Sequence, residues 1–179
     1  EKPIIVRLQS KHHSKVIYIT FIDSPGEHFE QINVLLEQHP NLQFANGIIF
    51  LMNPLDIEAM AKIIEKESPG TVPPREMRRK IRNSDIVENL YQLYVRTNQV
   101  KANKPIKVPT VFCVSRADLL EKSSNIYIPQ DFEPDLVEMD DIMEEMNLAS
   151  EDMRELLGET DISLLNLMDK SFKNYNIFP

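Results

Sequence analysis

The sequence is poor in cysteine, glycine and long apolar runs, and each shortage excludes a class of protein. Cys113 is the only cysteine among 179 residues, so no intrachain disulfide can form. Together with the lack of a secretory signal peptide, this favours a reducing, cytoplasmic setting. No apolar run approaches the ~20 residues of a membrane-spanning helix, so we expect no membrane span.

Acidic residues outnumber basic ones, 28 against 20, which gives a formal net charge of −8. A nucleic-acid-binding domain normally presents a net basic face, so this balance argues against a nucleic-acid partner. The basic residues between Arg75 and Arg82 form a local cluster, which we interpret as the polar face or first turns of a helix.

Short apolar runs of strand length recur along the chain. Strands are predicted at residues 4–8, 16–22, 47–52, 109–114 and 175–178, and the polar stretch 9–15 makes the first two an N-terminal β-hairpin. The chain starts with Glu1, close to the first strand, and ends on the last one. We therefore expect it to be part of a larger protein.

Amphipathic patterns typical of helices separate these strands. Helices are predicted at residues 29–38, 55–66, 81–96 and 161–172, with two acidic helices at 135–146 and 150–157. Ser150 is a candidate N-cap of the second acidic helix and Gly158 a candidate stop. The alternation predicts an α/β fold, with a mostly parallel sheet and helices on both faces. We expect one domain, with a helical insertion around residues 122–160.

The first candidate site segment is Asp23-Ser24-Pro25-Gly26, directly after a predicted buried strand. Ligands of parallel sheets bind at the carboxyl ends of the strands. An aspartate there can hold Mg²⁺ through water, and a glycine lets a backbone N–H approach a terminal phosphate. The same four residues also describe an ordinary turn.

The second segment, Ser115-Arg116-Ala117-Asp118, follows the predicted strand 109–114. A carboxylate at Asp118 can accept hydrogen bonds from N1 and the exocyclic amino group of guanine, donors that adenine lacks. The flat guanidinium of Arg116 can stack on the base. The alternative is a surface ion pair between Arg116 and Asp118 that caps the next helix.

The order of the elements and motifs resembles the G domain of P-loop GTPases of the translation-factor and Ras-like class. In this order a strand ends in Asp-x-x-Gly, a helix, a strand and a helix follow, and the next strand ends in Ser-Arg-Ala-Asp. The layout after Asp118 is similar to bacterial double-GTPase-type domains. The resemblance implies an incomplete P-loop GTPase-like three-layer sandwich over residues 1–179. It also implies that Asp23 organises Mg²⁺ and Gly26 contacts the γ-phosphate of GTP. By the same resemblance, we expect Ser115, Arg116 and Asp118 to hold the guanine nucleotide, GTP or GDP.

The sequence departs from the family pattern at several positions. Ser115 and Arg116 stand where the family usually has asparagine and lysine. Glu27, our candidate catalytic residue, stands where many members place a glutamine that orients water. A carboxylate can accept a proton from water but cannot donate a hydrogen bond to the γ-phosphate. His28 is the alternative candidate for orienting the water. The other interpretation of His28 is an exposed helix residue.

The largest departure is the lack of a GxxxxGK[ST] loop in a sequence with only four glycines. The family places the strand that carries this loop between the strand ending near Asp23 and the one ending near Met52. We therefore expect residues upstream of Glu1, or another chain, to supply that strand.

Two functional hypotheses follow. The intact protein binds and hydrolyses GTP as a switch, or the domain is a pseudo-GTPase that binds a protein partner through its acidic late helices.

Overall fold

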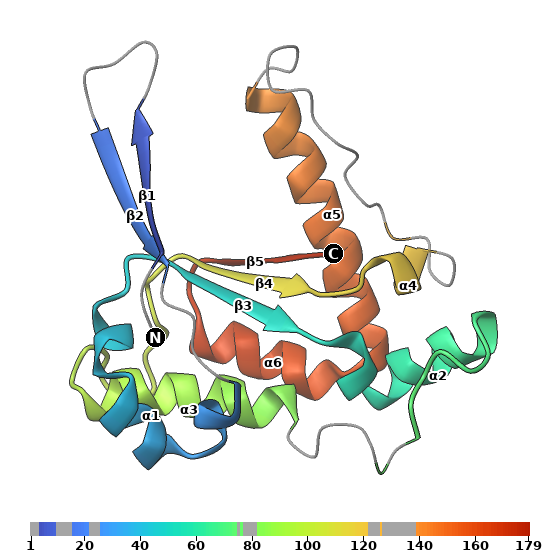
Figure 1. Cartoon of the computed structure of the whole chain (residues 1–179), viewed down its shortest axis with the longest axis horizontal. Helices are drawn as coiled ribbons and strands as arrows, with labels where there is room; N and C mark the ends of the chain where they lie inside the picture. Colours follow the sequence, from blue (N-terminus) through green and yellow to red (C-terminus); the bar gives the residue numbers. More distant parts are fainter. Residues whose placement is uncertain are drawn as a thin grey trace.

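The structure is a computed structural model that describes residues 4–9, 16–21, 26–74, 76, 82–121, 126 and 139–179. It is a mixed α/β fold with a three-stranded parallel sheet, an antiparallel hairpin and surrounding helices (Figure 1). No helix in the described ranges is long and apolar enough to cross a membrane.

The parallel sheet has the order β3-β4-β5, with β4 in the middle. Its register aligns Phe50 with Phe112 and Phe112 with Ile177. The strands are β3 (Ile48–Met52), β4 (Thr110–Val114) and β5 (Tyr175–Phe178). The predicted strands at 47–52, 109–114 and 175–178 are therefore confirmed to within one residue.

One face of the sheet is packed, and among the described residues the other face is exposed along β3. Phe112 and Ile177 are fully buried on the packed face, and the Phe112 ring meets the Phe172 ring at a centroid distance of 5.3 Å. On the opposite face, Ile49 and Leu51 are 63% and 70% exposed. Because side chains alternate along a strand, this contrast separates the two faces of β3.

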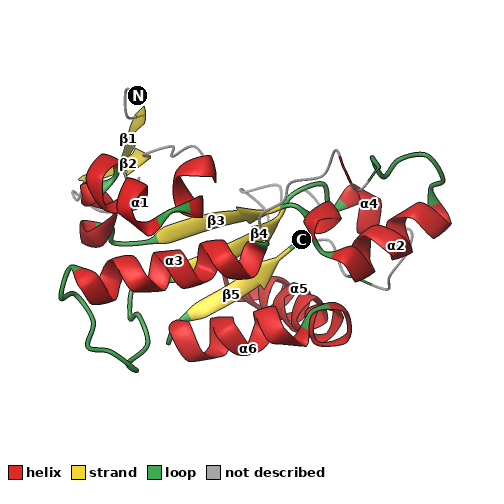
Figure 2. Cartoon of the chain, turned by 90° about the horizontal axis from the view of Figure 1, so that it is seen from below, coloured by secondary structure: helices red, strands yellow, loops and turns green. Residues whose placement is uncertain are grey.

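The packed face is covered by α3 (Asn83–Arg96) and α6 (Ile162–Ser171), which lie side by side under the strands (Figure 2). Buried side chains recur along α3 at helical spacing: Ile86, Val87, Leu90, Leu93 and Tyr94. A short helix, α1 (Ile32–Gln38), packs against α3. Helices on the second face of the sheet remain a prediction.

The hairpin consists of β1 (Ile4–Gln9) and β2 (Val16–Phe21), and Figure 1 shows it standing away from the sheet. Neither strand is hydrogen-bonded to the β3-β4-β5 sheet. Ile4, Ile5 and Tyr18 are each at least 64% exposed. A two-stranded hairpin is marginally stable in water on its own, so these apolar side chains indicate a surface that needs cover.

The remaining elements are short except for one. They are η1 (Gly26–Glu30), η2 (Pro40–Phe44), η3 (Pro54–Asp56), α2 (Glu58–Glu67), α4 (Asp118–Glu121) and α5 (Met139–Thr160). The predicted helix 55–66 thus divides into η3 and α2, and the predicted helix 29–38 into η1 and α1. In both places a 3₁₀ turn precedes the α-helix.

The two predicted acidic helices are wrong, because residues 139–160 form the single helix α5. Ser150 is no N-cap: it is buried, and its hydroxyl accepts a hydrogen bond of 3.2 Å from the Ile177 N–H of β5. Gly158 does not end the helix, because α5 continues to Thr160. The true boundary is Asp161, whose carboxylate accepts from the Leu164 N–H at 3.0 Å and caps α6.

Candidate functional site

The carboxyl ends of β3 and β4 meet at one rim of the sheet, and Ser115 joins them. Its N–H and its hydroxyl both donate to the Met52 carbonyl, at 2.8 and 3.0 Å. Directly after β3, the Asn53 side chain accepts from the Leu55 N–H at 3.2 Å and starts η3. Two polar turns therefore lie next to each other at this rim.

The turn after β4 is tight and has an unusual backbone. Arg116 has φ 56°, in the left-handed region that non-glycine residues seldom adopt. The Leu119 and Leu120 N–H groups donate to the carbonyls of Arg116 and Ala117, at 3.0 and 2.8 Å. The Leu120 side chain is fully buried, which fixes α4 to the core. Left-handed residues of this kind gather at binding sites, where the surroundings enforce them.

Asp118 is the first residue of α4, and both it and Arg116 are exposed. In the part of the chain that the structure describes, no ion pair joins these two side chains. The ion-pair alternative for this turn is therefore not what the structure contains. Among the described residues no ion pair engages the Asp118 carboxylate, so it can accept hydrogen bonds from a ligand.

The first candidate segment is mostly outside the described residues. Asp23, Ser24 and Pro25 are not among the residues that the structure describes. Gly26 and Glu27 are described by their backbone, as the first two residues of η1, and the Glu27 side chain is not described. The juxtaposition of Asp23 with Asp118, and the roles of Gly26 and Glu27, remain predictions.

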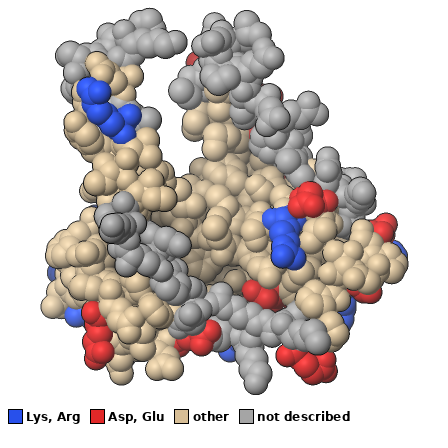
Figure 3. Space-filling view, in the orientation of Figure 1, with Lys and Arg blue, Asp and Glu red and all other residues tan. Residues whose placement is uncertain are grey.

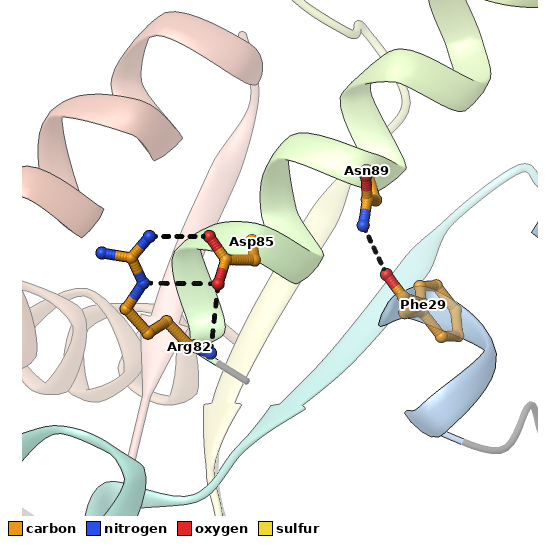
Figure 4. A network of polar contacts seen from close by, with 4 residues as sticks. All are labelled: Phe29, Arg82, Asp85 and Asn89. Carbon is orange, nitrogen blue, oxygen red and sulfur yellow. Dashed lines mark hydrogen bonds and ion pairs between the residues drawn. The ribbon is translucent and has the colours of Figure 1, made fainter. Parts of the chain in front are cut away.

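The far end of η1 is anchored to the helices beneath the sheet. The Asn89 side-chain amide of α3 donates to the Phe29 carbonyl at 2.7 Å (Figure 4). His28 is half-buried, and its Nδ1 lies 2.7 Å from Nε2 of His39. The His28 ring is thus engaged by a neighbouring histidine, which argues against the water-orienting role and against the exposed helix residue.

The same close-up shows how α3 begins. The Arg82 guanidinium forms two hydrogen bonds with the Asp85 carboxylate, at 3.1 and 3.3 Å (Figure 4). Asp85 also accepts from the Arg82 backbone N–H at 3.4 Å, so it satisfies one of the donors that a helix start leaves free. Asn89, one turn further on, is thereby held in register to reach Phe29.

The thiol of Cys113, near the carboxyl end of β4, is affected by burial and not by a neighbouring charge. Cys113 is half-buried on the same face as Ile49 and Leu51, and burial raises the pKa of its thiol. A protonated thiol is a poor nucleophile and a poor metal ligand. Within the described ranges, no group of three His, Cys, Asp or Glu residues could hold a metal ion. The Mg²⁺ prediction depends on Asp23, which those ranges do not include.

Sequence reasoning missed the part that Asn53 and Met52 play at this rim. The predicted strand 47–52 ends just before Asn53-Pro54, and no role was predicted for these two residues. The pattern of an asparagine directly after a buried strand could have marked it, since such residues lie where parallel sheets bind ligands. The contact of Ser115 with Met52 has no sequence signal, because it joins residues 63 positions apart.

Comparison with known proteins adds no relative: no protein-family model, no curated protein and no solved structure matches the chain. The functional argument therefore depends on the chemistry and geometry of the chain's own residues.

Proposed function

We propose that this chain is the distal part of a GTP-binding, GTP-hydrolysing switch domain with an incomplete P-loop GTPase-like sandwich. The observation that carries the proposal is the exposed Asp118 carboxylate, which follows the middle strand of a parallel sheet at its carboxyl end. A carboxylate there can select guanine, because it pairs with two donors that only guanine offers together.

The open edge of β3 is a second observation that supports the family resemblance. β3 has a strand partner on one side only among the described residues, and its Ile49 and Leu51 side chains are exposed. The hairpin also lacks a sheet partner there. The resemblance puts the phosphate-loop strand between these two elements, and such a strand would satisfy both free edges.

The surface between the two elements suits a further layer. The middle of the face drawn in Figure 3 is formed almost entirely by uncharged residues. Burying a side chain such as Ile49 or Leu51 contributes about 1.5–3 kcal/mol each. A strand with its flanking helix, supplied from outside these 179 residues, would therefore be held strongly.

The second candidate function is a pseudo-GTPase that binds a protein partner. The Ser115 hydroxyl favours it, because that hydroxyl is already engaged by the Met52 carbonyl instead of being free for a base. The acidic helix α5 also presents Met143 and Leu148, which are 47% and 49% exposed, next to its carboxylates. That combination suits a partner with basic and apolar groups.

A titration of the full-length protein with fluorescent GTP and ATP, in the presence of Mg²⁺, separates the two functions. The switch proposal expects GTP to bind in preference to ATP, and this preference to be lost in Asp118→Ala. Glu27→Ala should keep the base preference and slow hydrolysis. Asp141→Ala, an exposed acid on α5, is the matched control. If neither nucleotide binds to the full-length protein, the interaction module is the better account.

A further inference from the structure

The opposite end of the sheet carries a second feature, a hollow of about 660 Å³ at the amino ends of β3 and β4. These ends lie at the left of the sheet in Figure 2. The hollow is formed by the end of η2, by Tyr94 of α3 and by the loop that leads from α3 to β4. It is therefore separated from the Ser115–Asp118 turn by the length of the strands.

The lining combines an apolar floor with a basic rim. Ile106 and Tyr94 are 0% and 1% exposed, and the Tyr94 hydroxyl is already satisfied by the Leu42 carbonyl at 2.9 Å. Phe44, the last residue of η2, is 67% exposed although it is a large aromatic residue. Three exposed lysines complete the lining: Lys101, Lys104 and Lys107.

The charge at this end is opposite to that of the whole molecule. Residues 39–47, 97–109 and 171–176 contain none of the chain's 28 acidic residues. Lys173 belongs to the same end, because its N–H donates to the Ile106 carbonyl at 2.8 Å. Within the described ranges, no carboxylate pairs with Lys101, Lys104 or Lys107. A protein of net charge −8 thus keeps a group of unpaired cations around an apolar hollow.

We propose that this hollow binds a small organic anion, in which a carboxylate or phosphate is attached to an aliphatic or aromatic body. The apolar body would pack on Phe44, Val100 and Val108, which line the hollow and keep exposed surface, and the anion would lie among the three lysine ammonium groups. Lysine acts as a flexible point charge, so it accepts either anion. The volume falls within the ~300–1,000 Å³ of small-molecule sites, and mostly apolar lining with a few polar groups is typical of them. A concave site of this size favours a free small molecule over a protein segment.

The test uses three ligands that share a ten-carbon body and differ in the head group: decanoate, decyl phosphate and decanol. Isothermal titration calorimetry on the full-length protein should give a Kd for at least one of the anions about tenfold below that of decanol. Tenfold corresponds to about 1.4 kcal/mol. The difference should shrink as the salt concentration rises, because the lysines are exposed.

Two sets of variants assign the roles. Replacing Lys101, Lys104 and Lys107 together by glutamine should raise the Kd for the anion about tenfold and leave decanol binding unchanged. Phe44→Ala should weaken all three ligands. The control is Lys62→Gln with Lys66→Gln on α2, which removes exposed lysines away from the hollow and should change nothing.

A second measurement locates the ligand. Backbone amide chemical shifts of Phe44, Val100 and Lys107 should move on addition of the anion. The proposal is overturned if decanol binds as tightly as both anions, or if the triple lysine variant binds them normally. It is also overturned if the shifts move at Ile49 and Leu51 instead. Binding of an acidic peptide with residues 139–148, without binding of either anion, would make this a protein-docking surface and sink the small-molecule proposal.

Discussion

Ser115 ties the end of β4 to β3, because its N–H and its hydroxyl both donate to the Met52 carbonyl, at 2.8 and 3.0 Å. The two contacts set where the turn that carries Arg116 and Asp118 leaves the sheet. The same hydroxyl that the family resemblance assigns to a nucleotide is thus engaged in holding the rim together.

The first prediction concerns Ser115→Ala. The hydroxyl contact is lost while the backbone contact stays, so the free energy of unfolding should fall by about 0.5–1.5 kcal/mol. Urea denaturation measures the change, and Ser163→Ala on the exposed side of α6 is the control, expected within about 0.5 kcal/mol of the wild type. If Ser115→Ala is as stable as the control, the contact is not a structural one.

The second prediction concerns base choice at Asp118. Asp118→Asn replaces an acceptor oxygen by an N–H donor, which then faces the exocyclic amino group of guanine. Xanthine has a carbonyl at that position, so the variant should prefer xanthosine triphosphate, and GTP should bind at least about tenfold more weakly.

Fluorescence competition between the two nucleotides on the full-length protein measures the swap. Asp141→Asn supplies the same change in charge on α5 and should keep the preference for GTP. A variant at Asp118 that loses both nucleotides equally would show that the carboxylate supports the turn and does not read the base.

The third prediction tests whether a further layer covers the exposed face of β3. Ile49→Glu and Leu51→Glu replace side chains that are 63% and 70% exposed, so each should change the stability of the 179-residue chain by less than about 0.5 kcal/mol. In the full-length protein, the covering layer would bury these charges. Each variant should then lower the free energy of unfolding of the full-length protein by several kcal/mol, because burying an unpaired charge is unfavourable.

Thermal unfolding of both lengths provides the comparison. Phe112→Ala is the control. Because Phe112 is fully buried on the packed face, this substitution should lower the free energy of unfolding by about 3–5 kcal/mol in either length. Equal, small effects of Ile49→Glu in the two proteins would mean that no layer covers this face of β3, and the proposed three-layer sandwich would lose its main structural support.

Local patterns predicted most of the elements, because the physics that sets them is local. The runs at 48–52 and 110–114 are apolar on both faces apart from Thr110 and contain several β-branched residues, and both are strands of the parallel sheet. The periodic stripe of α3 was equally clear, from Ile86 to Tyr94. The ends of the elements were less accurate, as at the 3₁₀ turns before α1 and α2.

The errors came from contacts between distant residues. Ser150 has the side chain of a good N-cap, yet it lies inside α5 and its hydroxyl accepts a hydrogen bond from the Ile177 N–H of β5. The two interpretations of His28, a water-orienting ring and an exposed helix residue, did not include its contact with His39, which depends on how η1 and α1 fold together. No role was predicted for Lys101, Lys104 and Lys107, because Phe44, which lines the same hollow, is far from them along the chain.

The last prediction concerns Tyr94 and alkaline pH. Burial raises the pKa of its hydroxyl to about 12, from an ordinary value of 10.0. Between pH 10 and 12 the unfolded chain releases this proton while the folded chain keeps it, so folding loses stability as the pH rises. The slope is about 1.4 kcal/mol per pH unit, and the total is at most about 2.7 kcal/mol. Below pH 10 the contribution is fully present.

Tyr94→Phe removes this titration together with the hydrogen bond to the Leu42 carbonyl. That carbonyl still accepts from the Ala45 N–H at 3.1 Å, so the cost at pH 9 should be only about 1 kcal/mol. Tyr175, whose pKa is raised by burial and by Asp169, titrates in both proteins and cancels. Urea denaturation from pH 9 to 12 should therefore show the variant less stable at first and more stable at the end. Parallel curves would mean that the Tyr94 hydroxyl ionises as easily in the folded chain as in the unfolded one, and that α3 is packed more loosely there than its burial indicates.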